Sequence, residues 1–161
     1  MSSLSAKTSI NKYKVPQLFT NVDTWRDFSN NLDIGGGRYD TATEYLLEKY
    51  SIINYIYDPY NRPKEENDKL LKRKHYDTCT ISNVLNVILN EQERLEVLQL
   101  AKDKARYYVY INVWEGNKSG IKSPTQMNEK LEFYLDEIKQ VFYDWELSIK
   151  DKVITLKRKD K

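Results

Sequence analysis

The stretch Asn31-Leu-Asp-Ile-Gly-Gly-Gly-Arg-Tyr-Asp40 is the part of the sequence that decides which fold to expect. Asn31–Ile34 has the character of a short buried strand, and three consecutive glycines end it. Thr41–Tyr50 then carries apolar residues at helical spacing, and either Asp40 or Thr41 can cap its first turn. A strand, a glycine turn and a helix in this order predict the first unit of an α/β domain.

Strand and helix patterns continue to alternate after this unit. The expected strands are Ile52–Tyr57, Asp77–Ser82 and Tyr107–Trp114, and the expected helices are Lys64–Lys74, Glu91–Lys104 and Thr125–Trp145. Glu146–Ile149 and Lys152–Leu156 are expected to close the chain as a hairpin that turns at Lys150 and Asp151. This alternation predicts an α/β fold in which a mainly parallel sheet is flanked by helices.

Parallel sheets bind their ligands at the carboxyl ends of the strands. The three glycines, Asp58, Asn83 and Glu115 each follow an expected strand, so we expect them to gather at one edge of the sheet. This convergence is the main argument from the residues alone for a binding site.

The length of 161 residues suits one compact domain, which we place at residues 31–157. Residues 1–30 are rich in Ser, Thr, Asn and Lys and are expected to form an irregular leader, whose Val15–Phe19 and Trp25–Phe28 pack on the domain or cover a site. Residues 158–161 form a short basic tail. The simplest interpretation of the tail is solubility.

Bulk composition excludes several classes of protein. No apolar run approaches the roughly 20 residues that cross a bilayer, so no membrane partner is expected. The single cysteine, Cys79, rules out an internal disulfide framework and favours a reducing, cytoplasmic location. The net charge of +2 does not by itself indicate nucleic acid, although the 13 tyrosines offer surfaces on which bases could stack.

The glycine turn has two interpretations. Glycine lets the backbone approach a ligand closely, and the following helix N-terminus suits a nucleotide-like molecule, but tight turns also use glycine. Asp33 just before the glycines suits an ammonium group and would repel a pyrophosphate. The dinucleotide fingerprint also requires a third glycine where Asp40 stands. Asp58 can accept hydrogen bonds from a ribose, or it can simply form a turn before Pro59.

Leu32-Asp-Ile-Gly-Gly-Gly37 resembles the first motif of class I S-adenosylmethionine-dependent methyltransferases. Asp58 matches the acidic residue at the end of their second strand, and Tyr76–Ile88 looks like their fourth-strand segment and the turn after it. The resemblance covers about residues 30–157 and extends to small methyltransferase-like proteins of phages and bacterial DNA-modification loci. It implies a Rossmann-like methyltransferase fold and S-adenosylmethionine as the cofactor.

The resemblance also assigns roles to particular residues. Asp33 would orient the methionine end of the cofactor, and Asp58 would hold the ribose. Asn83, the candidate catalytic residue and also an expected cofactor-binding residue, would face the methyl group or the methionine backbone. The remaining expected cofactor-binding residues are Gly35, Gly36 and Gly37, which would lie against the cofactor, and Pro59 and Asn61, which follow Asp58. Only one helix fits between Asp58 and Thr78, so one strand-helix unit of the family and its adenine-contacting loop are expected to be missing.

Methyl transfer needs positioning more than acid–base chemistry, because the leaving group is neutral. A lone His75 and a lone Cys79 offer too few ligands for a zinc site, so no metal is expected. The leading hypothesis is therefore a methyltransferase with an unknown acceptor, nucleic acid being favoured. The alternatives are a non-catalytic methyltransferase-like module that binds the cofactor or a partner protein, and an enzyme that cleaves S-adenosylmethionine.

Overall fold

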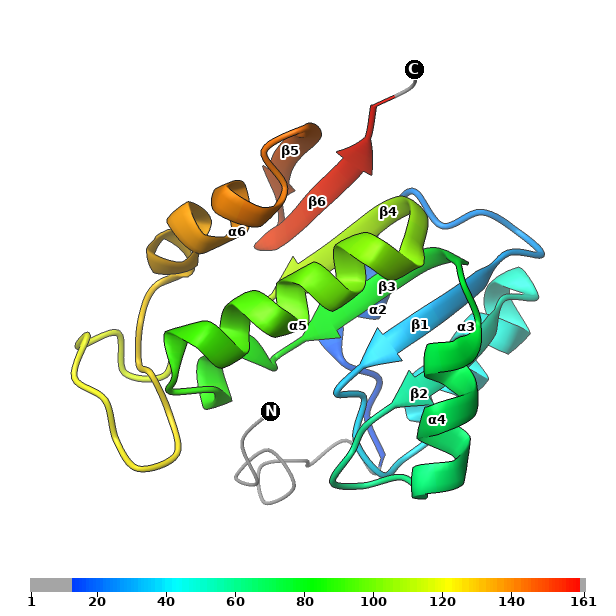
Figure 1. Cartoon of the computed structure of the whole chain (residues 1–161), viewed down its shortest axis with the longest axis horizontal. Helices are drawn as coiled ribbons and strands as arrows, with labels where there is room; N and C mark the ends of the chain where they lie inside the picture. Colours follow the sequence, from blue (N-terminus) through cyan, green and yellow to red (C-terminus); the bar gives the residue numbers. More distant parts are fainter. Residues whose placement is uncertain (1–12, 160–161) are drawn as a thin grey trace.

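The computed structural model describes residues 13–159, which fold around one six-stranded sheet (Figure 1). The strands lie in the order β2-β1-β3-β4-β6-β5. Their bounds are β1 Asn30–Ile34, β2 Ile53–Tyr57, β3 Tyr76–Ser82, β4 Ala105–Asn112, β5 Trp145–Lys150 and β6 Val153–Arg158. The helices are α2 Gln17–Asn21, α3 Thr41–Tyr50, α4 Lys64–Lys72, α5 Glu91–Lys104 and α6 Leu135–Val141, with short 3₁₀ turns η1 Leu85–Val87 and η2 Leu131–Tyr134.

Strands β2, β1, β3 and β4 are parallel, whereas β6 runs antiparallel to both β4 and β5. The hairpin between β5 and β6 turns at Asp151 and Lys152, one residue later than the sequence predicts. Both turn residues have positive φ, the geometry that matches the twist of a two-residue hairpin. The expectation of a mainly parallel α/β sheet is confirmed, and β2 forms its edge because the chain passes directly through α4 to β3.

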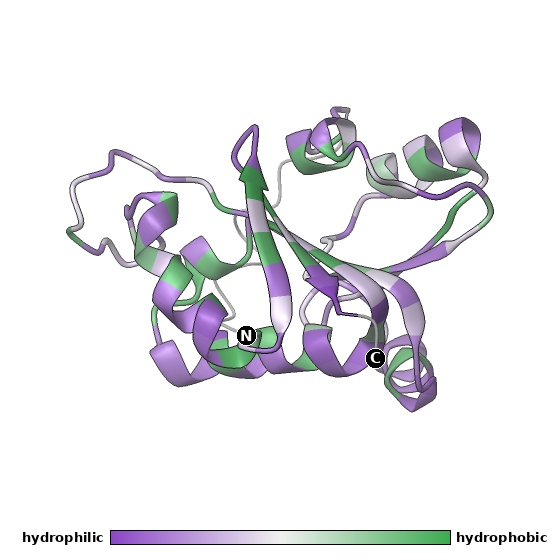
Figure 2. Ribbon diagram, turned by 90° about the horizontal axis from the view of Figure 1, so that it is seen from above, coloured by the Kyte–Doolittle hydropathy of each residue, from purple (hydrophilic) through white to green (hydrophobic). Residues whose placement is uncertain are grey.

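Helices cover both faces of the sheet (Figure 2). On one face, α5 and α6 bury Leu98, Ala101 and Ile138 against strand residues such as Ile81 and Val109. On the other face, α2 and α3 form a smaller apolar cluster with the strands. The members of this cluster that are buried are Leu18, Phe19, Val22, Trp25, Ala42, Leu46, Ile52, Tyr110 and Val153.

The N-terminal segment is more ordered than its composition suggests. Residues 1–12 of the expected leader and residues 160–161 of the basic tail lie outside the described part of the chain. Within the rest, α2 is helical and Asn30 already belongs to β1, so the expectation of an irregular segment up to residue 30 is wrong at these places. The physical reason is burial, because Leu18, Phe19 and Trp25 pack on the sheet.

The expected helix Thr125–Trp145 is also wrong. Only Leu135–Val141 is α-helical, and Trp145 starts β5. Asn128 adopts a left-handed backbone with φ 58°, and its side-chain amide donates to the Ile121 carbonyl at 3.0 Å. The Met127 N–H donates to the Asn86 carbonyl at 2.9 Å. Tertiary hydrogen bonds therefore hold the start of this segment as a loop despite its helical pattern.

Candidate functional site

The register of the sheet brings the expected site residues into one row. Tyr57 pairs with Ile34, so Asp58 lies level with Gly35 at the carboxyl end of β1. Asp33 pairs with Thr80, so Gly35 is also level with Ser82, which itself pairs with Asn112 of β4. We call Asp58, Gly35, Ser82 and Asn112 the carboxyl-edge row. The edge at which ligands of such sheets bind thus carries the glycine loop at its centre.

The glycine loop, Gly35–Gly37, needs all three glycines. Gly35 and Gly37 have φ of 74° and 83°, in the left-handed region. Gly36 is required for space, because a Cβ there would lie 2.5 Å from the Asp33 Oδ2 atom and 3.0 Å from Ile56. The Asp33 carboxylate therefore packs directly beneath the loop backbone.

Asp33 is a buried carboxyl with a directional set of hydrogen bonds. Only 2% of the residue is exposed, and burial raises its pKa to about 7, against a hydrogen bond from Thr80 that lowers it. The Thr78 hydroxyl donates to Asn31 at 2.7 Å, the Asn31 amide donates to Thr80 at 3.0 Å, and the Thr80 hydroxyl donates to Asp33 at 2.9 Å. Each donor in this relay points toward Asp33, which stabilises its ionised form in a site that otherwise disfavours charge.

Asp58 holds the glycine loop to the turn after β2. Its Oδ2 atom accepts from the Gly37 N–H and the Asn61 side-chain amide, both at 3.0 Å. Its Oδ1 atom accepts from the backbone N–H groups of Tyr60 at 3.0 Å and Asn61 at 3.2 Å. The side chain is buried and four donors surround its carboxylate, so a ribose would have to displace one of them.

The loop after Asp58 fastens the same region a second time. The Arg62 guanidinium donates to the Gly37 carbonyl at 2.9 Å and forms an ion pair with Asp40 at 2.8 Å. Pro59 is exposed, whereas the Asn61 amide is engaged with Asp58. Of the two cofactor-binding residues expected after Asp58, only Pro59 is thus open to a ligand as the loop stands.

Asn83 and Ser82 offer polar groups at the centre of the row. Asn83 is exposed with φ 55°, and its N–H donates to the Asn112 carbonyl at 3.1 Å. Its side-chain amide has no hydrogen bond to any residue between 13 and 159. The Ser82 hydroxyl is buried and has no partner in the described chain. A buried hydroxyl without a partner is unusual, because buried polar groups are normally paired.

Other polar residues near this edge hold the scaffold. Glu115 accepts from the Lys152 ammonium and the Leu131 N–H, and these two contacts lower its pKa. Asn86 is buried and donates to Gln126 at 3.0 Å. Cys79 is buried in the core, which raises the pKa of its thiol and makes it a poor nucleophile.

The described part of the chain is residues 13–159. Over this range no group of three His, Cys, Asp or Glu side chains is arranged to hold a metal ion. None of the helices in the same range has both the length and the apolar character to cross a membrane.

No protein-family model and no curated protein matches this sequence. The structure is nevertheless similar to solved methyltransferase structures. One is in the complex between the Haloferax volcanii Trm112 methyltransferase activator and a methyltransferase, with a TM-score of 0.58 and 7% identity over 88% of this chain and 87% of that chain. The chain has a Rossmann-like methyltransferase fold.

A second solved structure with this methyltransferase fold is the pyocyanin biosynthetic protein PhzM. It has a TM-score of 0.56 and 14% identity over 86% of this chain, which spans about half (52%) of the PhzM chain. Identities this low establish the fold and leave the chemistry to the site itself. The part of the sequence resemblance that concerns the fold is confirmed, and the likeness to small phage and bacterial proteins stays a prediction.

Proposed function

We propose that the carboxyl-edge row binds S-adenosylmethionine and that the protein transfers its methyl group. The observation that carries the proposal is the glycine loop at the end of β1 of a methyltransferase fold, packed on the buried Asp33 carboxylate. S-adenosylmethionine supplies a methyl group on a positively charged sulfur and also carries an ammonium group. A carboxylate beneath uncharged glycine backbone favours such a cation and disfavours a pyrophosphate.

The free polar groups fit the methionine end of this cofactor. The Asn83 amide is exposed and can bond its amino-acid group or orient the methyl acceptor. The Ser82 hydroxyl is buried and would join it only if a neighbouring group moved. Asp58 would take the ribose if the Asn61 amide gave up its place on Oδ2, because that amide is the donor from a side chain that can rotate. Gly36 lets the loop backbone lie directly on the Asp33 carboxylate, and Pro59 and Asn61 would border the adenine.

Calorimetric titration of the protein with S-adenosylmethionine, its demethylated product and NAD tests the proposal. Wild type should bind the first two and not NAD. Asn83→Ala and Asp58→Ala should weaken binding about tenfold or more, since each loses a hydrogen bond to the ligand. Gln140→Ala, an exposed amide on α6, serves as the matched control for Asn83→Ala. If the wild type does not bind S-adenosylmethionine, the proposed function is wrong. If both substitutions leave binding unchanged, the assignment of these residues to the site is wrong.

The closed state of Asp58 favours a second candidate, a non-catalytic module. A carboxylate with four donors stabilises the loop without any ligand. The Haloferax volcanii neighbour is found in a complex with a methyltransferase activator, so a protein partner is a reasonable proposal here as well. If the protein binds the cofactor but methylates no nucleic-acid, protein or small-molecule acceptor, the non-catalytic module is favoured over the methyltransferase. Turnover of the cofactor with no acceptor present would instead indicate a cleaving enzyme.

A further inference from the structure

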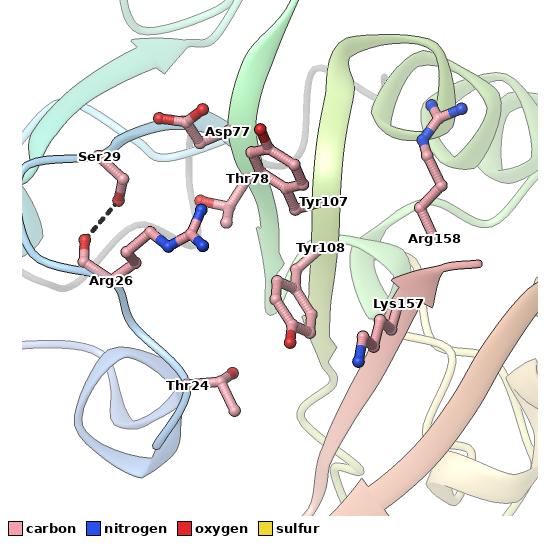
Figure 3. A pocket seen from close by; sticks show the side chains of 9 residues that line it. All are labelled: Thr24, Arg26, Ser29, Asp77, Thr78, Tyr107, Tyr108, Lys157 and Arg158. Atoms are coloured by element: carbon pink, nitrogen blue, oxygen red, sulfur yellow. Dashed lines mark hydrogen bonds between the residues drawn. The ribbon is translucent and has the colours of Figure 1, made fainter. Parts of the chain in front are cut away.

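A pocket lies at the amino-terminal edge of the sheet, opposite the glycine loop (Figure 3). Its volume is about 350 Å³, within the usual range of small-ligand sites. The lining side chains come from the segment before β1, the first residues of β3 and β4, and the last residues of β6. They are Thr24, Arg26, Ser29, Asp77, Thr78, Tyr107, Tyr108, Lys157 and Arg158. Thr78 lies four residues and Asp77 five residues before Ser82, which is level with Gly35, so this amino-edge pocket lies about 15 Å along the strands from the glycine loop, at roughly 3.3 Å per residue.

A β-bulge builds the aromatic wall of the pocket. Tyr76 pairs with Ala105, but the next pair along the two strands is Thr78 with Tyr108, so β4 has one more residue than β3 between these points. An extra residue breaks the alternation of side chains along a strand. The consecutive residues Tyr107 and Tyr108 consequently both line the pocket. Tyr107 is 41% exposed, so part of its ring is open to a ligand.

Cations face these rings. The Arg26 guanidinium lies 5.4 Å from the centre of the Tyr107 ring, and Figure 3 shows its side chain reaching across the pocket. Lys157 pairs with Tyr108 across the strands and makes no hydrogen bond or ion pair with any described residue. Its cross-strand neighbour on the other side is Glu146, which forms no ion pair with it in residues 13–159. Arg158 is a third cation at the rim, but its guanidinium faces the Trp145 ring at 4.8 Å and donates to the Ala105 carbonyl at 3.0 Å.

The carboxylate among the lining residues, that of Asp77, already makes a hydrogen bond within the protein. Asp77 accepts from the Asn30 N–H at 3.0 Å, and the Asn30 side chain accepts from the Asp77 N–H at 2.7 Å. The positive charge also continues along the same edge of the sheet. The pKa of His75 is lowered, by burial first and then by the nearby cations Arg106, Lys74, Arg158 and Lys104. A pocket lined by two tyrosine rings is therefore followed by a track of cations.

We propose that the amino-edge pocket holds one nucleotide of a single-stranded nucleic acid. The base would lie on Tyr107, and the adjacent phosphates would meet Arg26 and Lys157. Aromatic platforms beside cationic grooves are how proteins bind single strands without reading their sequence. The track of cations beyond the pocket favours a strand over a free nucleotide, because a lone nucleotide has no phosphates to place there. Since this edge is distant from the glycine loop, the contact anchors the strand and takes no part in methyl transfer.

Fluorescence anisotropy with a labelled single-stranded oligonucleotide of about ten residues tests the proposal. Wild type should bind it in low salt, and Tyr107→Ala should weaken binding roughly tenfold, the effect of losing one stacked base. Lys157→Glu should weaken binding at least as much. Replacing both Arg26 and Lys157 by Ala should lower the slope of log affinity against log salt by about 1.4, for two phosphate contacts.

Matched control variants distinguish an effect at the pocket from a general effect of net charge or a loss of folding. Lys139→Glu changes the net charge equally at an exposed position on α6, and Tyr143→Ala removes an exposed tyrosine elsewhere. Both should bind like wild type, and thermal unfolding of each variant checks that it is folded at the temperature of the binding assay. If adenosine monophosphate binds as tightly as the oligonucleotide, the ligand is a free nucleotide and the proposal of a single strand is wrong. Equal losses in pocket and control variants, or no binding at all, would overturn the site.

Discussion

Replacing Asp33 by asparagine should remove the loss of folding stability that the wild type shows as pH rises. The carboxyl is 2% exposed, and its pKa rises from 3.8 to about 7, chiefly because burial disfavours the charge. This shift corresponds to about 4 kcal/mol, at about 1.4 kcal/mol per pKa unit. The folded state holds the proton more tightly than the unfolded state, so the stabilisation is complete below pH 4 and is lost as pH rises through about 7. The amide in the Asp33→Asn variant cannot ionise, and its carbonyl can still accept from Thr80.

Urea denaturation from roughly pH 5 to pH 8.5 measures the effect. The free energy of unfolding of Asp33→Asn relative to wild type should rise by about 3 kcal/mol across this range, the share of the linkage that falls between these limits. The difference between the two proteins is the useful quantity, because every other titrating group contributes equally to both. Curves that stay parallel within about 0.5 kcal/mol would refute the assignment of a strongly raised pKa to Asp33.

Four further substitutions probe the surroundings of Asp33 and one other buried polar contact. Gly36→Ala should destabilise the protein by about 1–3 kcal/mol and abolish cofactor binding, because its Cβ would meet the Asp33 carboxylate at 2.5 Å; thermal unfolding and calorimetry report the two losses. Thr80→Val should raise the pKa of Asp33 further, which NMR titration of the carboxyl carbon would detect as a higher midpoint. Glu137→Leu should cost about 3–5 kcal/mol by stranding the buried Arg94 that it contacts at 2.6 Å, and adding Arg94→Met should recover most of that loss in urea denaturation; a double variant no better than the single one would contradict this.

Local sequence patterns predict most of the helices and strands correctly. The helices Thr41–Tyr50 and Glu91–Lys104 have the bounds that apolar spacing and capping residues predict. The strands agree within one or two residues, because runs of β-branched and aromatic side chains bounded by turn residues are a short-range signal. The pattern fails where tertiary contacts outweigh it. Thr125–Lys130 remains a loop because Met127 and Asn128 bond to other parts of the chain.

The candidate site divides in the same way. The sequence by itself determined that a glycine loop follows β1 and that Asp33, Asp58 and Asn83 stand at strand ends, because strand and turn signals are local. Only the tertiary structure decided what those side chains contact. The register of the strands places Ser82 level with Gly35, and the Asp58 carboxylate points inward and accepts hydrogen bonds from four donors.

The amino-edge pocket belongs wholly to the tertiary structure. Its rings and cations come from three distant segments around Arg26, Tyr107 and Lys157, and the sequence alone showed only many tyrosines and scattered basic residues. A one-residue bulge in β4 places both tyrosines in the pocket, and such a shift in pairing depends on how two strands meet and leaves no mark in either strand alone.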